Sequence, residues 1–210
     1  MKKTFVLVIL FVFPLVAYLF FASGVNNFGK LPILTEGVPN INGIESAVSL
    51  DDKITVLGFM GENVEGRKGN AFNLNQKIYK RFHEFKDFQL VMMVANGQEQ
   101  YVKELKAELG QLSPTNKWHF VFTSTDNIKM FFKELKTDMD LDGDFGTSQV
   151  FIIDKDLNLR GRDDDEEEGV KYGFNTTSVA DLNNKMEDDV KIILAEYRLA
   201  LKKNNANRNK

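Results

Sequence analysis

Residues 54–59 read ITVLGF, a short apolar run rich in β-branched and aromatic side chains. A run that is apolar on both faces is typical of a strand buried inside a sheet. A polar, glycine-rich stretch, GENVEGRKG at residues 61–69, follows and predicts a loop. Beyond it, with Asn70 as the predicted N-cap, apolar residues recur at helical spacing: Leu74, Ile78, Phe82 and Phe85. The segment therefore predicts a strand, a loop and a helix.

The same kind of apolar run recurs three more times along the chain. FQLVMMVA at 88–95, WHFVF at 118–122 and VFII at 150–153 each predict a buried strand. After a polar turn, LNLRGR at 157–162 is predicted to pair with the last of these strands as a hairpin.

Helical periodicity fills the intervals between these strands. Tyr101, Leu105 and Leu109 mark a second helix, and Asp126 is the predicted cap of a third. The C-terminal helix has the clearest start, because Ser178 with an acid three residues later forms a variant capping box.

Strands that alternate with helices predict a mostly parallel central sheet with helices on both faces. The closing hairpin and the C-terminal helix complete an α/β, thioredoxin-like arrangement. We assign this domain to residues 51–203, preceded by a linker and lead-in at 24–50 and followed by a disordered basic tail at 204–210.

Composition excludes several functions. None of the 210 residues is cysteine, so disulfides, thiol redox catalysis, thiolate metal sites and iron–sulfur clusters are impossible. Lys and Arg number 27 against 30 Asp and Glu, and a mildly acidic domain is a poor match for nucleic acid. No pattern requires a cofactor, and the lack of thiol chemistry favours a non-enzymatic role.

The N-terminus predicts a membrane anchor. Residues 4–22 carry no charge and, as a helix, would span about 28 Å, close to the hydrocarbon thickness. Lys2 and Lys3 should stay in the cytoplasm, which places the domain on the periplasmic side of the inner membrane. A cleaved signal peptide is the alternative, because small residues follow at 22–24.

The chain resembles the Sco/SenC branch of the thioredoxin-like superfamily, which comprises membrane-anchored copper chaperones and thiol reductases of cytochrome oxidase assembly. The tether before a thioredoxin-like domain, LGF at 57–59 and VFIIDKDLNLRGR at 150–162 carry the resemblance, over roughly residues 44–203. It implies a protein partner in the cell envelope.

The residues that the family uses for copper are missing. Its two Cys positions of a CxxxC loop fall near Glu62 and Gly66, and its His position falls at Gly146, beside Thr147. Copper(I) selects soft ligands, so the inherited chemistry is predicted to be lost. A loop rebuilt for binding would use residues of the same stretch: Glu62, Asn63, Gly66, Arg67 and Lys68.

Two acidic stretches and two histidines offer alternatives. Asp138, Asp140, Asp142 and Asp144 resemble the start of a calcium loop, although the twelfth position is Gln149 and a strand follows. The six acids at 163–168 predict a solvated, mobile loop that could dock a basic partner. His83 and His119 lie far apart and favour structural roles, and the Asn175 sequon arises often by chance.

The sequence thus predicts a non-catalytic binding or assembly protein displayed outside the cytoplasm. A calcium-stabilised module, through residues 138–144, and an enzyme using carboxylate acid–base chemistry remain the alternatives.

Overall fold

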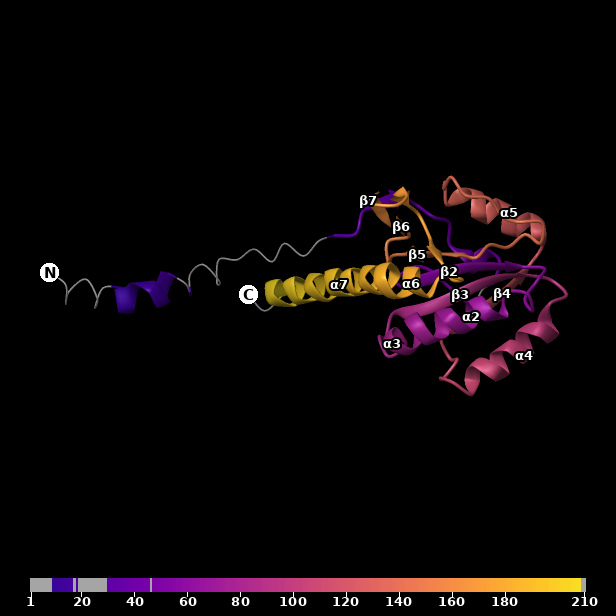
Figure 1. Cartoon of the computed structure of the whole chain (residues 1–210), viewed down its shortest axis with the longest axis horizontal. Helices are drawn as coiled ribbons and strands as arrows, with labels where there is room; N and C mark the ends of the chain where they lie inside the picture. Colours follow the sequence, from indigo (N-terminus) through magenta and orange to yellow (C-terminus); the bar gives the residue numbers. More distant parts are fainter. Residues whose placement is uncertain (1–8, 17, 19–29, 46, 209–210) are drawn as a thin grey trace.

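The computed structural model describes residues 9–16, 18, 30–45 and 47–208, with the backbone alone for 201–208. Its centre is a sheet in the order β1-β6-β5-β2-β3-β4, and β9 pairs with β5 (Figure 1). The sheet strands are β1 (Ile33–Thr35), β2 (Ile54–Gly61), β3 (Phe88–Ala95), β4 (Trp118–Thr123), β5 (Gln149–Ile153), β6 (Leu159–Arg160) and β9 (Phe174–Asn175).

This order is that of a thioredoxin-like fold, but the sheet is mixed rather than mostly parallel. Only β2, β3 and β4 run parallel, whereas β5, β6, β1 and β9 each pair antiparallel. The reason lies in the connection between α5 and β5. This loop does not cross back to the amino end of the sheet, so β5 begins at the carboxyl end of β2 and runs antiparallel to it. Tight turns then force β6 to run antiparallel as well, which confirms the predicted hairpin at 157–162.

The helices follow the predicted pattern with shifted starts, and the first ends at Phe82, so the predicted Phe85 lies beyond it and is 47% exposed. They are η1 (Ile41–Gly43), α2 (Lys68–Leu74), η2 (Asn75–Tyr79), α3 (Lys80–Phe82), α4 (Glu99–Gly110), α5 (Thr125–Glu134), α6 (Val179–Asp181), η3 (Leu182–Met186) and α7 (Glu187–Arg208). Two of these, η2 and η3, are single π-helical turns inside longer helices.

Two predicted caps were wrong. Asn70 lies inside α2, because the chain already winds from Val64, whose carbonyl accepts from the Arg67 amide at 3.2 Å. Ser124, not Asp126, caps α5 by accepting from the Asn127 amide. The Ser178 cap is confirmed, since its side chain accepts from the Asp181 amide.

Alternate residues of each strand feed two separate cores. One core packs beneath α2, η2, α3, α4 and α7, and Figure 1 shows these helices together on one face of the sheet. The other lies beneath α5 and the lead-in, which contributes Val38, Ile41, Val48 and Leu50. On α4 the predicted Tyr101 is 45% exposed, because the neighbouring Val102 faces the core instead.

The acidic run forms part of a hairpin rather than an irregular loop. It lies in a hairpin of β7 (Arg162–Asp165) and β8 (Gly169–Lys171). Asp165 is buried and accepts from Lys185 Nζ at 2.9 Å and from two backbone amides of the turn. These donors offset the repulsion that the sequence alone implied, although the other five acids are exposed.

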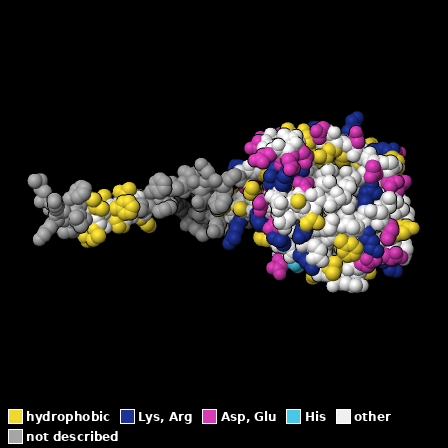
Figure 2. Space-filling model, viewed as in Figure 1, with side chains coloured by type: hydrophobic (Ala, Val, Ile, Leu, Met, Phe, Trp, Pro, Cys, Tyr) yellow, Lys and Arg dark blue, Asp and Glu magenta, His cyan; other side chains and the backbone are white. Residues whose placement is uncertain are grey.

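Residues 4–8, 17 and 19–22 of the predicted anchor lie outside the described residues. Figure 2 shows the hydrophobic side chains of residues 9–16, and among them Phe11 and Phe13 are 68% and 70% exposed. No helix in the described part of the chain is both long enough and apolar enough to cross a bilayer.

Candidate functional site

The loop after β2 meets the loop before β5 at the carboxyl end of the parallel strands. The Glu62 amide donates to the Asp144 carbonyl at 2.8 Å, and the Thr147 amide donates to the Phe59 carbonyl at 3.0 Å. Between these bonds Gly61 has φ +58°, and a Cβ there would lie 1.9 Å from the Asp144 carbonyl oxygen. Only glycine tolerates this approach, so the backbone of both loops is held together.

Arg67 fills the space between the two loops. Its side chain is 9% exposed, and its guanidinium binds the Asp142 carboxylate and lies 4.0 Å from that of Asp144. Asn63 joins the same network, because its side chain donates to Asp144 at 2.8 Å and accepts from the Gly66 amide at 2.8 Å. A buried cation therefore offsets part of the negative charge of Asp142 and Asp144 from within the protein.

Gly146 makes this arrangement possible. A Cβ at that position would lie 2.6 Å from both Cζ and Nε of Arg67. The Asp142 carboxylate also accepts from the amides of Asp144 and Gly146, at 3.0 and 3.2 Å. The position that the resemblance assigns to a histidine is thus packed against an arginine side chain.

The remaining predicted loop residues face outward. Glu62 is exposed, and Thr147 is half-buried. Lys68 binds Glu108 of α4 at 2.5 Å, and this hydrogen bond raises the pKa of the lysine. The loop therefore presents charged groups to solvent around the buried Arg67.

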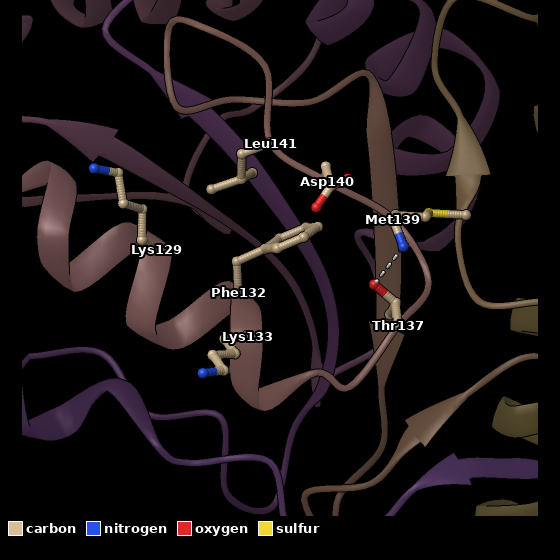
Figure 3. Close-up of a pocket in the computed structure, with 7 residues that line it drawn as sticks. All are labelled: Lys129, Phe132, Lys133, Thr137, Met139, Asp140 and Leu141. Atoms are coloured by element: carbon tan, nitrogen blue, oxygen red, sulfur yellow. Dashed lines mark hydrogen bonds between the residues drawn. The ribbon is translucent and has the colours of Figure 1, made fainter.

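The four aspartates of the predicted calcium loop do not converge. Asp140 instead lines a shallow cavity of about 390 Å³ between α5 and residues 137–141, where the Met139 amide donates to Thr137 Oγ1 at 3.3 Å (Figure 3). Among the described residues, no three His, Asp or Glu side chains are placed to hold a metal ion. Asp142 and Asp144, the pair that does come together, bind Arg67.

The donor set does not fit copper(I) either. The positions that would supply thiolates hold Glu62 and Gly66, and a guanidinium lies against the position that would supply an imidazole. A fixed positive charge opposes a second cation at short range, where the Coulomb term is largest. The absence of cysteine also excludes thiol redox activity of the thioredoxin type.

Carboxylate acid–base chemistry finds no enclosed site here. The side chains of Asp142 and Asp144 are 51% and 50% exposed and are both engaged with the arginine network. A catalytic carboxyl group ordinarily needs burial or a like charge to shift its pKa. Both carboxylates are open to solvent and lie beside a cation, so they form no closed pocket for a substrate.

Two features of this site escaped the sequence reasoning. The pairing of Arg67 with Asp142 joins residues 75 apart, and no local pattern signals it. Behind Arg67 lies a cavity of only about 20 Å³, whose wall includes the thioether side chains of Met60 and Met92. Both methionines belong to the core beneath α2, so they pack rather than face solvent.

The histidines lie apart from this network. His83 follows α3 and stacks on Tyr79 at a centroid distance of 5.3 Å. His119 is half-buried in β4, and burial lowers its pKa. Their structural placement agrees with the prediction.

No protein-family model matches the chain, and no curated protein matches it. Solved structures do. The soluble domain of Sco1 from Bacillus subtilis aligns at 15% identity over 80% of this chain and 99% of its own, with a TM-score of 0.46. A SCO1/SenC family lipoprotein from Bacillus anthracis aligns at 17% identity over 78% and 96%, with a TM-score of 0.45.

A thiol:disulfide interchange protein of the thioredoxin family from Chlorobium tepidum aligns at 18% identity over 78% of this chain and 99% of its own, with a TM-score of 0.46. Sco1/SenC proteins are therefore among the structures that the chain is similar to, at low identity. The fold assignment itself rests on the strand order described above.

Proposed function

We propose that this chain is a membrane-anchored, non-catalytic, Sco-like protein that binds a protein partner in the cell envelope. The main support is the network of Arg67, Asn63, Asp142 and Asp144. It joins the two loops of a thioredoxin-like site that has no thiol. Ligands of open α/β sheets bind at the carboxyl ends of the strands, where these loops lie. A loop pair fixed by hydrogen bonds offers a preorganised surface for recognition.

The rim of this surface sets the chemistry of the partner. Glu62 is exposed, and Asp142 and Asp144 are half-exposed, around a guanidinium that is almost wholly buried. The outward charge is therefore acidic, which complements a partner with basic or hydrogen-bond-donating groups.

The anchor is part of the proposal. Residues 4–22 are uncharged, Lys2 and Lys3 precede them, and the side chains described within this stretch are exposed and apolar. Such exposure suits lipid rather than water. The positive-inside rule then places the domain on the periplasmic side of the inner membrane.

Affinity capture of the full-length protein from membranes tests the proposal. Recovery of respiratory oxidase or thiol-relay components at stoichiometric levels is expected. Glu62→Lys should weaken recovery, whereas Glu84→Lys, an equal charge change on an exposed residue at the opposite edge of the sheet, should leave it unchanged. Equal recovery of the partner with both variants would show that the partner does not bind the surface around Glu62.

Copper titration of the purified chain provides a second test. The native protein is expected to show no saturable submicromolar binding. A variant with Glu62→Cys, Gly66→Cys, Gly146→His and Arg67→Ala restores the family's ligand positions without the arginine and serves as the comparison. One tight equivalent of copper on the native chain would overturn the non-metal interpretation.

A further inference from the structure

Helix α7 extends well past the domain that it packs on. Among the side chains of α7 that the structure describes, which end at Ala200, Ile193 is the last that is fully buried, and the helical backbone continues to Arg208. Figure 1 shows it leaving the sheet on the same side where the N-terminal lead-in, drawn in indigo, enters the domain. Core packing therefore explains only the first part of this helix.

The extension has a one-sided charge. Glu196 is the last acidic residue of the chain, and five basic residues follow it: Arg198, Lys202, Lys203, Arg208 and Lys210. A run of basic residues without acids is attracted to an anionic surface.

The start of the domain is fastened to the same helix. The Leu31 amide donates to Glu196 Oε1 at 2.9 Å, and Arg160 Nε donates to the Leu31 carbonyl at 2.8 Å. Arg160 also binds Glu196 at 2.9 Å, so three elements meet at one point. Leu31, at the start of the domain, and Glu196, on α7, are therefore in direct contact.

Chain lengths then limit how far the helix end lies from a membrane. Eight residues lie between Ala22 and Leu31, and the nine Cα–Cα steps that join these two positions span at most about 30 Å. From Glu196 to Arg208 the helix advances about 18 Å. With the tether fully extended and the helix pointing toward the bilayer, the remaining gap is about 12 Å, close to the Debye length of about 8–10 Å at physiological salt.

We propose that residues 198–210 bind anionic phospholipid of the membrane that holds residues 4–22, which rests on the anchor proposed above. Together the tether and the basic helix end form two contacts with one bilayer. Two contacts restrict rotation of the domain, which one flexible tether would permit. The acidic loop surface is then carried on the part of the domain remote from this helix end.

The cysteine-free chain permits a direct test with a single introduced label. Full-length protein with Asn207→Cys carries an environment-sensitive fluorophore and is reconstituted into vesicles of phosphatidylcholine, with or without phosphatidylglycerol, that contain a lipid-bound quencher. Gln100→Cys, an exposed position on α4, is the matched control.

Phosphatidylglycerol is expected to increase quenching at position 207 by at least about twofold, and about 0.5 M salt should reverse the increase. Lys202→Glu with Lys203→Glu should abolish it, whereas position 100 should not respond. Equal quenching in both vesicle types, or an increase that survives charge reversal, overturns the lipid contact.

Flotation after a carbonate wash separates this proposal from the anchor. Protein that floats with the vesicles but shows no response at position 207 would support the anchor and contradict the lipid contact of the helix end. Protein that does not float would contradict both the anchor and the lipid contact.

Discussion

Two buried arginines hold the two ends of this domain, and their partners differ. Arg160 is 5% exposed and binds Asp154, which is 1% exposed, together with Glu196 at 15% side-chain exposure. Arg67 is 8% exposed, but Asp142 and Asp144 are about half-exposed. The same residue type is therefore used once inside the protein and once at its edge.

The difference separates a structural role from a site that remains accessible. Burial alone would lower the pKa of Arg160, but its hydrogen bonds to Glu196 and Asp154 outweigh burial and raise it. Removing the Arg160 guanidinium leaves buried carboxylates without a cation. Removing Arg67 leaves carboxylates that water can solvate. The first arginine fastens the lead-in and α7 to the sheet, and the second shapes a surface.

Arg160→Leu should have the largest effect. Breaking a buried ion pair by removing one partner costs about 3–5 kcal/mol, and here two acids and the Leu31 carbonyl lose their donor. Urea unfolding monitored by circular dichroism measures the change. Lys129→Leu, which removes a half-exposed lysine paired to exposed Asp126, is the control and should cost less than about 1 kcal/mol. Similar losses in both variants would refute the structural role of Arg160.

Gly61→Ala is expected to come next. The new Cβ would meet the Asp144 carbonyl oxygen, and an alanine at φ +58° is itself strained, so about 2–3 kcal/mol should be lost. Gly69→Ala provides the contrast, since that glycine lies in α2 with open space around its Cβ position and alanine favours helix. A Gly61→Ala protein as stable as the native chain would mean that the two loops are not held together.

Arg67→Ala should cost about 1–2 kcal/mol, because its hydrogen bonds involve charged but half-exposed partners. Gly146→Ala should displace the guanidinium and cost a similar amount. In the double variant the losses should not add, with a coupling of at least about 0.5 kcal/mol. Additive losses in a double-mutant cycle would show that Gly146 does not pack against Arg67.

His119→Gln should have the smallest effect, visible only through pH. Burial, aided by Lys106 and Lys53, lowers the pKa of His119 below 6.5. The unfolded chain then takes up a proton more readily, so this contribution to stability is full above pH 6.5 and is lost as the pH falls through the folded pKa. His119→Gln should flatten the pH dependence of the urea midpoint across this window, with His83→Gln as the matched loss of one imidazole. An unchanged slope would contradict the assignment.

Much of the fold was predictable because each strand and helix carries its own periodic signal. The runs at 54–59 and 88–95 are apolar enough to be buried in any arrangement, and Ser178 announces the last helix through a local hydrogen bond. The start of α5 was missed because Ser124 and Asp126 are both good capping residues. Local composition does not say which of two neighbouring caps the backbone uses.

The sequence predicted which stretches of the chain form the site, but not the contacts between them. The glycine-rich loop and residues 138–144 were each singled out, yet as separate features. Asp142 and Asp144 of the stretch that resembled a calcium loop are bound by Arg67, and Asp165 of the hairpin is bound by Lys185. In both places the cationic partner comes from a different element of the fold.

By itself, the sequence determined the thiol-free chemistry, the apolar N-terminal stretch and the alternation of strands and helices, because each depends on residue types or on neighbours a few positions apart. The tertiary structure alone decided the antiparallel setting of β5 and the placement of Arg67 against Gly146 and Asp142. Those outcomes depend on contacts between residues that lie 75 apart for Arg67 and Asp142 and 92–98 apart for β2 and β5, whose energies arise only once the sheet has brought the segments together.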